Sequence, residues 1–208
     1  MKYKVLLWDM DGTLMDSKEG LLRSLSYTLE VCGLPPTDEK TLRSFLGPSL
    51  HYTFTHYYGF SEERAQEAVR IFRQHFAAHG MLEGNVPYPG IMELLESLKQ
   101  AGYRMAVATS KLERFAHTIG AHFGLTRYFE QICGSDAEGT RPEKPEVIAY
   151  ALTYFADCAR SEILMIGDRR MDVEGAAQNG IDAAAVLYGY GDREELTGAK
   201  YILPSVVV

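Results

Sequence analysis

Two acidic residues directly follow the first apolar run of the chain. Asp9 and Asp11 come after residues 5–8, and Gly12 and Thr13 follow them. In extended backbone, residues two apart point the same way, so both carboxylates can face one site. Carboxylates this close repel each other unless a cation or a shared proton compensates. Mg²⁺ meets this need, because it takes oxygen ligands and commonly binds one or two carboxylates together with a phosphate. Taken alone, the same residues would also suit a turn or a helix cap.

Polar residues also follow two later apolar runs. They are Thr109, Ser110 and Lys111 after one run, and Asp168 and Asp172 after the other. In an open parallel sheet, ligands bind beyond the carboxyl ends of the strands. We therefore expect these residues to meet Asp9 and Asp11 at one site suited to phosphate chemistry.

The elements that must position these residues alternate between strands and helices. Apolar runs predict strands at residues 5–8, 103–108, 131–133, 162–166 and 182–187. Helical spacing of apolar residues predicts helices at residues 91–101, 113–123, 143–155 and 173–179. Such alternation is typical of an α/β fold, a doubly wound parallel-sheet (Rossmann-like) core with helices on both faces.

Residues 16–83 interrupt this alternation, because they carry helical patterns only. We expect helices at about 20–32, at about 38–46 after Thr37 as its N-cap, and from Ser61 to about residue 79. The chain is thus predicted to fold as an α/β core of residues 1–15 and 84–208 with a small all-helical insertion of residues 16–83. Residues 51–60 of this insertion are unusually aromatic, which suits packing between helices or a stacking surface for a nucleobase.

Composition narrows the function classes. A net charge of −7 and a pI near 5.4 argue against nucleic acid or a membrane surface as partner. The first apolar run is too short for a signal peptide or a membrane span. Cys32, Cys133 and Cys158 are widely spaced and lack metal-ligand spacing, so we expect reduced thiols in a cytoplasmic protein. A strand near the end can leave a sheet edge exposed, and we expect a monomer or a homodimer.

Four stretches in order resemble the motifs of the haloacid dehalogenase superfamily. Residues 9–14 (DMDGTL) resemble its first motif, D-x-D-G-T-[LV], and residues 107–111 (VATSK) resemble the second, a strand ending in Thr or Ser. Lys144 before Pro145 resembles the third, and residues 167–172 (GDRRMD) resemble the fourth, G-D-x-x-x-D. Within the superfamily, the chain is most similar to the phosphoglycolate phosphatase-like group and its 5′-nucleotidase-like branch. Residues 134–141 (GSDAEGTR) and 187–191 (LYGYG) also support this branch.

The resemblance implies that residues 1–15 and 84–208 form the catalytic core and that residues 16–83 form a helical cap. It also implies a role for each residue that matches a motif. Asp9 would be the nucleophile, Asp11 the general acid and base, and Thr109 and Lys144 further catalytic groups, with Lys111 as the competing lysine. Gly12, Thr13 and Ser110 would bind phosphate, aided by the positive end of a helix that starts at Thr109. The residues implied to bind Mg²⁺ are Asp9, Asp11 (through its backbone carbonyl) and Asp168. Asp172 would either bind Mg²⁺ directly or support the residues that bind it.

The implied activity is a Mg²⁺-dependent phosphatase that hydrolyses a small phosphate monoester through an aspartyl phosphate. Its substrate would be a small phosphorylated metabolite, phosphoglycolate-like or a nucleoside 5′-monophosphate. A second acid at position 11 favours phosphoryl transfer over carbon–halogen cleavage. Two alternatives stay open: a phosphomutase of the same superfamily, and a catalytically silent binding module.

Overall fold

The computed structural model describes residues 2–137 and 139–206 and divides the chain into two compact units. One unit consists of Met1–Asp16 with Pro87–Val208, and the other of Ser17–Val86. The sequence had suggested that the chain crosses between units after residues 15 and 83. Two short strands, β2 (Met15–Asp16) and β3 (Val86–Pro87), pair with each other at the two crossings.

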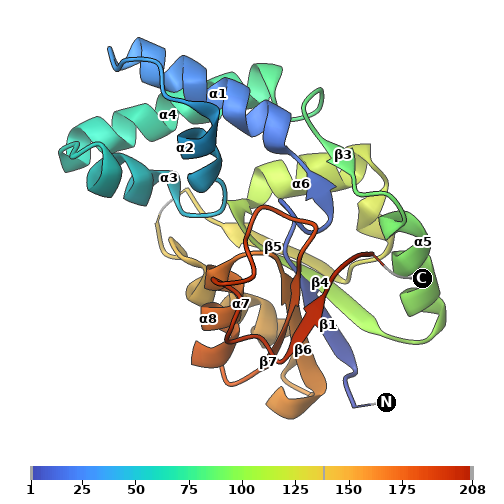
Figure 1. The fold of residues 1–208 in the computed structure, drawn as a ribbon. Helices are drawn as coiled ribbons and strands as arrows, with labels where there is room; N and C mark the ends of the chain where they lie inside the picture. Colours follow the sequence, from blue (N-terminus) through green and yellow to red (C-terminus); the bar gives the residue numbers. More distant parts are fainter. Residues whose placement is uncertain (1, 138, 207–208) are drawn as a thin grey trace. The chain divides into compact units, whose positions relative to one another are not determined.

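The larger unit is built on a six-stranded parallel sheet (Figure 1). The strand order is β5 (Gln131–Ser135), β4 (Arg104–Leu112), β1 (Val5–Trp8), β6 (Ile163–Gly167), β7 (Asp182–Val186) and β8 (Tyr201–Leu203). Val5 pairs in register with Arg104 on one side and with Ile163 on the other, so β1 is a central strand. All four of its side chains are buried, as expected for a strand covered on both faces.

Helices cover both faces of the sheet. They are α5 (Ile91–Gln100), α6 (Glu113–His122), α7 (Lys144–Leu152) and α8 (Arg170–Gln178), with short 3₁₀ turns at Leu125–Arg127, Thr153–Phe155 and Arg160–Glu162. Val5 and Leu7 of β1 share a core cluster with Val147 of α7 and Val173 of α8. Among the described residues of that cluster, none belongs to α5 or α6, as expected if right-handed crossovers put these two helices on the opposite face. The predicted α/β doubly wound fold is confirmed.

The smaller unit contains helices and no strand apart from β3 at its end, within the residues described. Its elements are α1 (Lys18–Val31), α2 (Glu39–Ser44), α3 (Leu50–Tyr52) continued by a π-helical turn (Thr53–Tyr57), and α4 (Glu62–His79). The expected N-cap of α2 was wrong. Asp38 caps this helix by accepting a hydrogen bond from the Thr41 amide, because the Thr37 hydroxyl is paired with the hydroxyl of Tyr58.

The aromatic segment 51–60, left without a helix in the sequence interpretation, forms α3 and the π-helical turn. Phe54 stacks on Phe60 at 5.7 Å between ring centroids, which supports the packing interpretation for these two rings. Tyr52 and Tyr57 are exposed on the surface of this unit.

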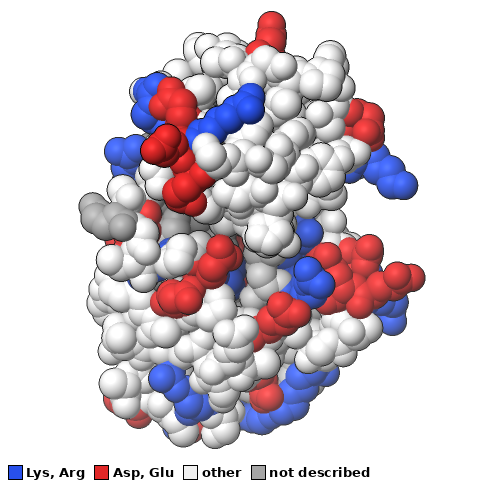
Figure 2. Space-filling model, turned by 90° about the vertical axis from the view of Figure 1, so that its left-hand side faces the viewer, with Lys and Arg blue, Asp and Glu red and all other residues white. Residues whose placement is uncertain are grey.

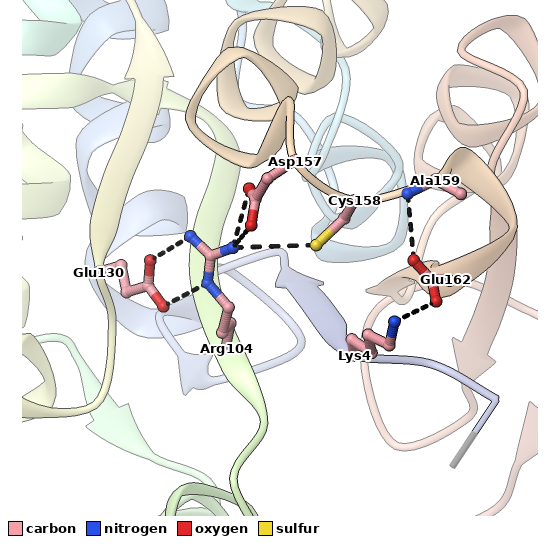
Figure 3. A network of polar contacts seen from close by, with 7 residues as sticks. All are labelled: Lys4, Arg104, Glu130, Asp157, Cys158, Ala159 and Glu162. Atoms are coloured by element: carbon pink, nitrogen blue, oxygen red, sulfur yellow. Dashed lines mark hydrogen bonds and ion pairs between the residues drawn. The ribbon is translucent and has the colours of Figure 1, made fainter.

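The amino ends of the strands are held by a polar network around Arg104 (Figure 3). Its guanidinium donates two hydrogen bonds to the Glu130 carboxylate, both 2.9 Å, and two to Asp157 at 2.8 and 3.0 Å. Lys4, just before β1, forms an ion pair with Glu162, just before β6. These contacts lie at the opposite end of the sheet from the carboxyl ends of the strands, so they stabilise the sheet without entering the predicted site.

Surface and hydropathy features agree with the composition. On the face drawn in Figure 2, the described lysine and arginine side chains lie beside acidic side chains rather than in one continuous basic patch. Across residues 2–137 and 139–206, every helix is too short or too polar to cross a membrane.

Candidate active site

Two adjacent strands, β1 and β6, end at the same edge of the sheet and bring the predicted acidic residues together. Asp9 directly follows β1, Asp168 directly follows β6, and Asp172 lies in the first turn of α8. Each offers an oxygen within 4.8 Å of the others, and all three side chains are buried. Helix α8 begins at Arg170 rather than at residue 173, and this earlier start carries Asp172 into the site.

Lys144 occupies the centre of this acidic group. Its Nζ lies 2.7 Å from Asp9 Oδ1 and 2.7 Å from Asp172 Oδ1, and it donates to the Ala108 carbonyl at 3.0 Å. The side chain is only 1% exposed, so this lysine is not a solvated loop charge. The first turn of α7 suits Pro145, because proline has a fixed helical φ and lacks the N–H that would have no partner there. Pro145 thus favours a helix start at Lys144, which directs this lysine into the site.

The buried charges shift one another's protonation. Burial raises the pKa of Asp9 to about 6, while Lys144 acts in the opposite direction. Burial alone would lower the pKa of Lys144, but the carboxylates of Asp172 and Asp9 raise it above its usual range. Burial, with the Asp9 and Asp172 carboxylates nearby, raises the pKa of Asp168 well above its usual value. A group of carboxylates held in this way is poised to bind a cation.

Lys111, the competing lysine, contacts the other acid of the first motif. Its Nζ lies 2.9 Å from Asp11 Oδ2, and its side chain is 4% exposed. The structure therefore brings one buried lysine to Asp9 and another to Asp11.

The end of β4 differs from the expectation. The strand was predicted to stop at residue 108, but it continues to Leu112, and α6 begins at Glu113, where the helix of residues 113–123 was expected. Pairing with β5 shifts in register between Ala108 and Leu112. Thr109 is buried, and its hydroxyl oxygen accepts a hydrogen bond from the Lys111 amide at 3.3 Å. Thr109 and Ser110 thus lie on an irregular strand end, and the positive end of a helix is not available at Thr109.

Comparison with known proteins decides the family. The family model for haloacid dehalogenase-like hydrolases matches residues 6–186. The chain belongs to this family. It is 42% identical over 196 residues to a 5′-nucleotidase of Pseudomonas aeruginosa, and this match covers 94% of this chain and 88% of that protein. It is 38% identical over 188 residues to the tyrosine-protein kinase PtkA of Mycobacterium tuberculosis, covering 90% of this chain and 63% of that protein.

A solved structure agrees with this assignment. A predicted phosphatase from Clostridium acetobutylicum is 42% identical and superposes with a TM-score of 0.94, covering 99% of this hydrolase and 95% of that chain. The resemblance drawn from the four motifs is confirmed.

In this hydrolase the first motif turns tightly against Asp168. Gly12 has φ +82°, a left-handed conformation that side chains rarely adopt, and a Cβ atom there would clash with the Asp168 carboxylate. The hydroxyl of Thr13 donates to Asp168 Oδ1 at 3.1 Å and is fully buried. Thr13 therefore orients a carboxylate of the site in this structure.

A loop after β7 completes the support of Asp168. The Tyr190 amide donates to Asp168 Oδ2 at 2.6 Å, and the Tyr188 hydroxyl donates to the Thr13 carbonyl at 3.0 Å. Gly189 lies against Gly12 and Asp168, where a Cβ atom would not fit. The sequence interpretation used residues 187–191 only to assign the branch. Their position at the carboxyl end of a fourth strand was the available signal for a role at the site.

The arginines of the fourth motif differ from each other. Arg169 is buried, and its Nε lies 2.6 Å from Glu195 Oε1. Arg170 is exposed and lies 3.8 Å from Glu174 on the next turn of α8.

The residues at this edge suit a divalent cation. Four carboxylates (Asp9, Asp11, Asp168 and Asp172) face two ammonium groups (Lys111 and Lys144), so negative charge is in excess. Carboxylate oxygen is the ligand that Mg²⁺ prefers. Asp172 Oδ2 accepts a hydrogen bond from the Arg169 amide at 3.0 Å, and Oδ1 lies 2.7 Å from Lys144 Nζ as an ion pair without a hydrogen bond. These contacts favour a supporting position for this residue.

Proposed function

We propose that this hydrolase is a Mg²⁺-dependent phosphatase that cleaves a small phosphate monoester through an aspartyl phosphate on Asp9. The observation that carries the proposal is the meeting of Asp9, Asp168 and Lys144 at the ends of adjacent strands, with Asp11 beside them. Family membership and the relatives named as phosphatase and 5′-nucleotidase support a phosphoric monoester hydrolase.

The proposed reaction has two steps. An Asp9 oxygen attacks phosphorus, the bond from phosphorus to the substrate oxygen breaks, and Asp11 gives a proton to the departing alkoxide. Water then attacks the phosphorus of the aspartyl phosphate, Asp11 takes up the proton, and the bond to Asp9 breaks to release phosphate. Two displacements replace one slow hydrolysis, and Asp11 returns to its starting state.

The other residues bind and orient. Lys144 holds Asp9 and offers positive charge to phosphoryl oxygens, and Thr109, Ser110, Gly12 and Thr13 remain predictions as phosphate-binding residues. Asp9, Asp168 and the Asp11 backbone carbonyl would hold Mg²⁺, with Asp172 behind or among them. When bound, Mg²⁺ supplies positive charge that reduces repulsion between the anionic nucleophile and the phosphate.

The proposed substrate class is phosphoglycolate-like esters or nucleoside 5′-monophosphates. The 5′-nucleotidase of P. aeruginosa supports the second, and the exposed Tyr52 and Tyr57 are residues on which a base can stack. The smaller unit is proposed to be the cap that sets this choice. Kinase activity is not carried over from PtkA, since the match spans 63% of its length.

Release of phosphate from p-nitrophenyl phosphate tests the proposal. We expect turnover with Mg²⁺, loss of turnover in EDTA, and recovery when Mg²⁺ is added in excess. A panel of phosphoglycolate, nucleoside 5′-monophosphates and hexose phosphates then ranks the substrates. Isomerisation of a hexose phosphate without phosphate release would indicate a phosphomutase. A clean preparation that is inactive on every ester would indicate a silent binding module.

A further inference from the structure

A second buried lysine stands at the site, and the proposed reaction gives it no task. Lys111 lies near the end of β4, and its side chain is 4% exposed. Burying an ammonium group is costly unless a partner repays the lost hydration. Its partner is Asp11 Oδ2, at 2.9 Å. Lys144 already serves Asp9, so the presence of Lys111 calls for its own explanation.

The backbone is shaped to aim this lysine. The register of β4 against β5 shifts between Ala108 and Leu112, and such irregularities re-aim side chains beside active sites. The Lys111 amide donates a hydrogen bond to the Thr109 hydroxyl oxygen at 3.3 Å, which stabilises this irregular part of the strand. Lys111 is therefore held at its backbone as well as at its ammonium group.

Asp11 is the acid that most needs such a partner. Its side chain is 19% exposed, against 10% for Asp9, and its charge and that of the Asp9 carboxylate repel each other. A general acid works only within hydrogen-bond reach, about 2.6–3.2 Å, of the atom that receives its proton. An ion pair to a fixed ammonium group restricts where the Asp11 carboxylate can lie.

We propose that Lys111 is a positioning residue that holds the carboxylate of Asp11 where the leaving group of the substrate arrives. This inference rests on the proposed role of Asp11 in the phosphatase reaction. Lys111 acts through Asp11, so its loss affects the departure of the leaving group rather than the binding of the phosphoryl group.

Two substrates that differ in leaving group separate these effects. Phenyl phosphate releases a more basic oxygen than p-nitrophenyl phosphate and depends more on a proton donor. The value of kcat/KM reports the first chemical step even where hydrolysis of the aspartyl phosphate limits kcat. For Lys111→Met we expect a loss of about 100-fold on phenyl phosphate, within the usual range for general acid catalysis, and less than about tenfold on p-nitrophenyl phosphate.

Companion variants make the test specific. Lys111→Arg keeps the positive charge and should restore most of the leaving-group response. Lys111→Met added to Asp11→Asn should cause no further loss, because the two residues act as a unit. Lys111→Gln is a second neutral variant if the methionine variant melts too low to assay. The control is Lys200→Met, which removes an exposed lysine 2.7 Å from Asp182 and should leave kcat/KM unchanged.

Two results would overturn the inference. One is an equal loss on both substrates, which would mean that Lys111 contacts the phosphoryl group or supports the fold. The other is a full further loss in the Asp11→Asn background. Failure of the parent proposal is distinguishable, because the wild-type protein would then release no phosphate from either ester, and the role of Lys111 would fall with it.

Discussion

Gly12 lies directly against the carboxylate of Asp168, and the next residue, Thr13, donates a hydrogen bond to the same carboxylate. Thr13 and Asp168 are 155 positions apart in the sequence. The turn of the first motif therefore packs directly against the carboxylate of Asp168, which follows β6. Orientation of Asp168 depends on the absence of a side chain at position 12, as well as on the hydrogen bonds from Thr13 and from the Tyr190 amide.

Replacing Gly12 with alanine should weaken Mg²⁺ binding. The new Cβ displaces Asp168, and changes to groups that orient a metal ligand typically cost about 10- to 100-fold in affinity. Gly102→Ala is a matched control, because Gly102 has φ +84° but no atom within 4 Å of its Cβ position. Both variants should lose about 1–2 kcal/mol of unfolding free energy to left-handed strain. Calorimetric titration with Mg²⁺ should separate them, and equal Mg²⁺ affinities would contradict this view of Gly12.

Asp9→Asn should abolish turnover while the fold is retained. An amide is not a nucleophile toward phosphorus, so we expect kcat on p-nitrophenyl phosphate to fall about a thousandfold or more. Circular dichroism and the melting temperature check the fold. The control is Asp157→Asn, which changes an aspartate at the opposite end of the sheet and should keep full activity. More than a few per cent residual activity in Asp9→Asn would show that another group attacks the substrate.

The strands and the acidic residues at their ends were predictable from sequence because their signals are local. Short apolar runs identify buried strands, and parallel strands share the edge where their carboxyl ends lie. Asp9 and Asp168 could thus be placed on one edge without knowledge of any side-chain contact. The start of α7 followed in the same way from Pro145 beside Lys144.

Features that depend on distant partners could not be predicted. Polar residues after Ala108 suggested that β4 had ended, but Lys111 remains on the strand and its charge is met by Asp11. Thr37 looked like a good N-cap, but Tyr58 takes its hydroxyl and Asp38 replaces it. In each case the deciding partner lies at least 20 residues away in sequence. Local propensity has no access to such a partner.

Asp182 gives the protein a stability component that disappears in acid. Hydrogen bonds from Lys200, Lys2 and Tyr3 lower the pKa of Asp182 below its ordinary value of 3.8. A carboxyl group whose pKa is lower in the folded state stabilises the folded protein at pH values above its unfolded-state pKa. This contribution is lost as the pH falls through the folded-state pKa. At pH 7, Asp182→Asn should cost about 1 kcal/mol, since the group is partly exposed. Urea unfolding should show the difference shrinking below pH 4, and a constant difference would contradict the assignment.

Arg104 should contribute to stability and not to catalysis, because it anchors the amino end of β4 (Figure 3). It joins Glu130 to Asp157, and its guanidinium lies 4.7 Å from the centre of the Phe155 ring. Arg104→Met keeps an aliphatic stem but loses both ion pairs. Exposed pairs are worth up to about 1 kcal/mol each, so we expect a loss of about 1–2 kcal/mol in urea unfolding.

The matched control for Arg104 is Arg43→Met, which removes an exposed pair with Glu39 within one helix and should cost less than about 0.5 kcal/mol. Neither change should alter kcat/KM on p-nitrophenyl phosphate by more than about twofold, because substitutions far from the active-site residues are expected to act independently of them. A large activity loss in Arg104→Met would mean that strain at the amino end of β4 reaches Thr109 and Lys111 at its other end. In that case the strand would couple stability to the positioning of Asp11, and the two ends of the sheet could not be treated as independent.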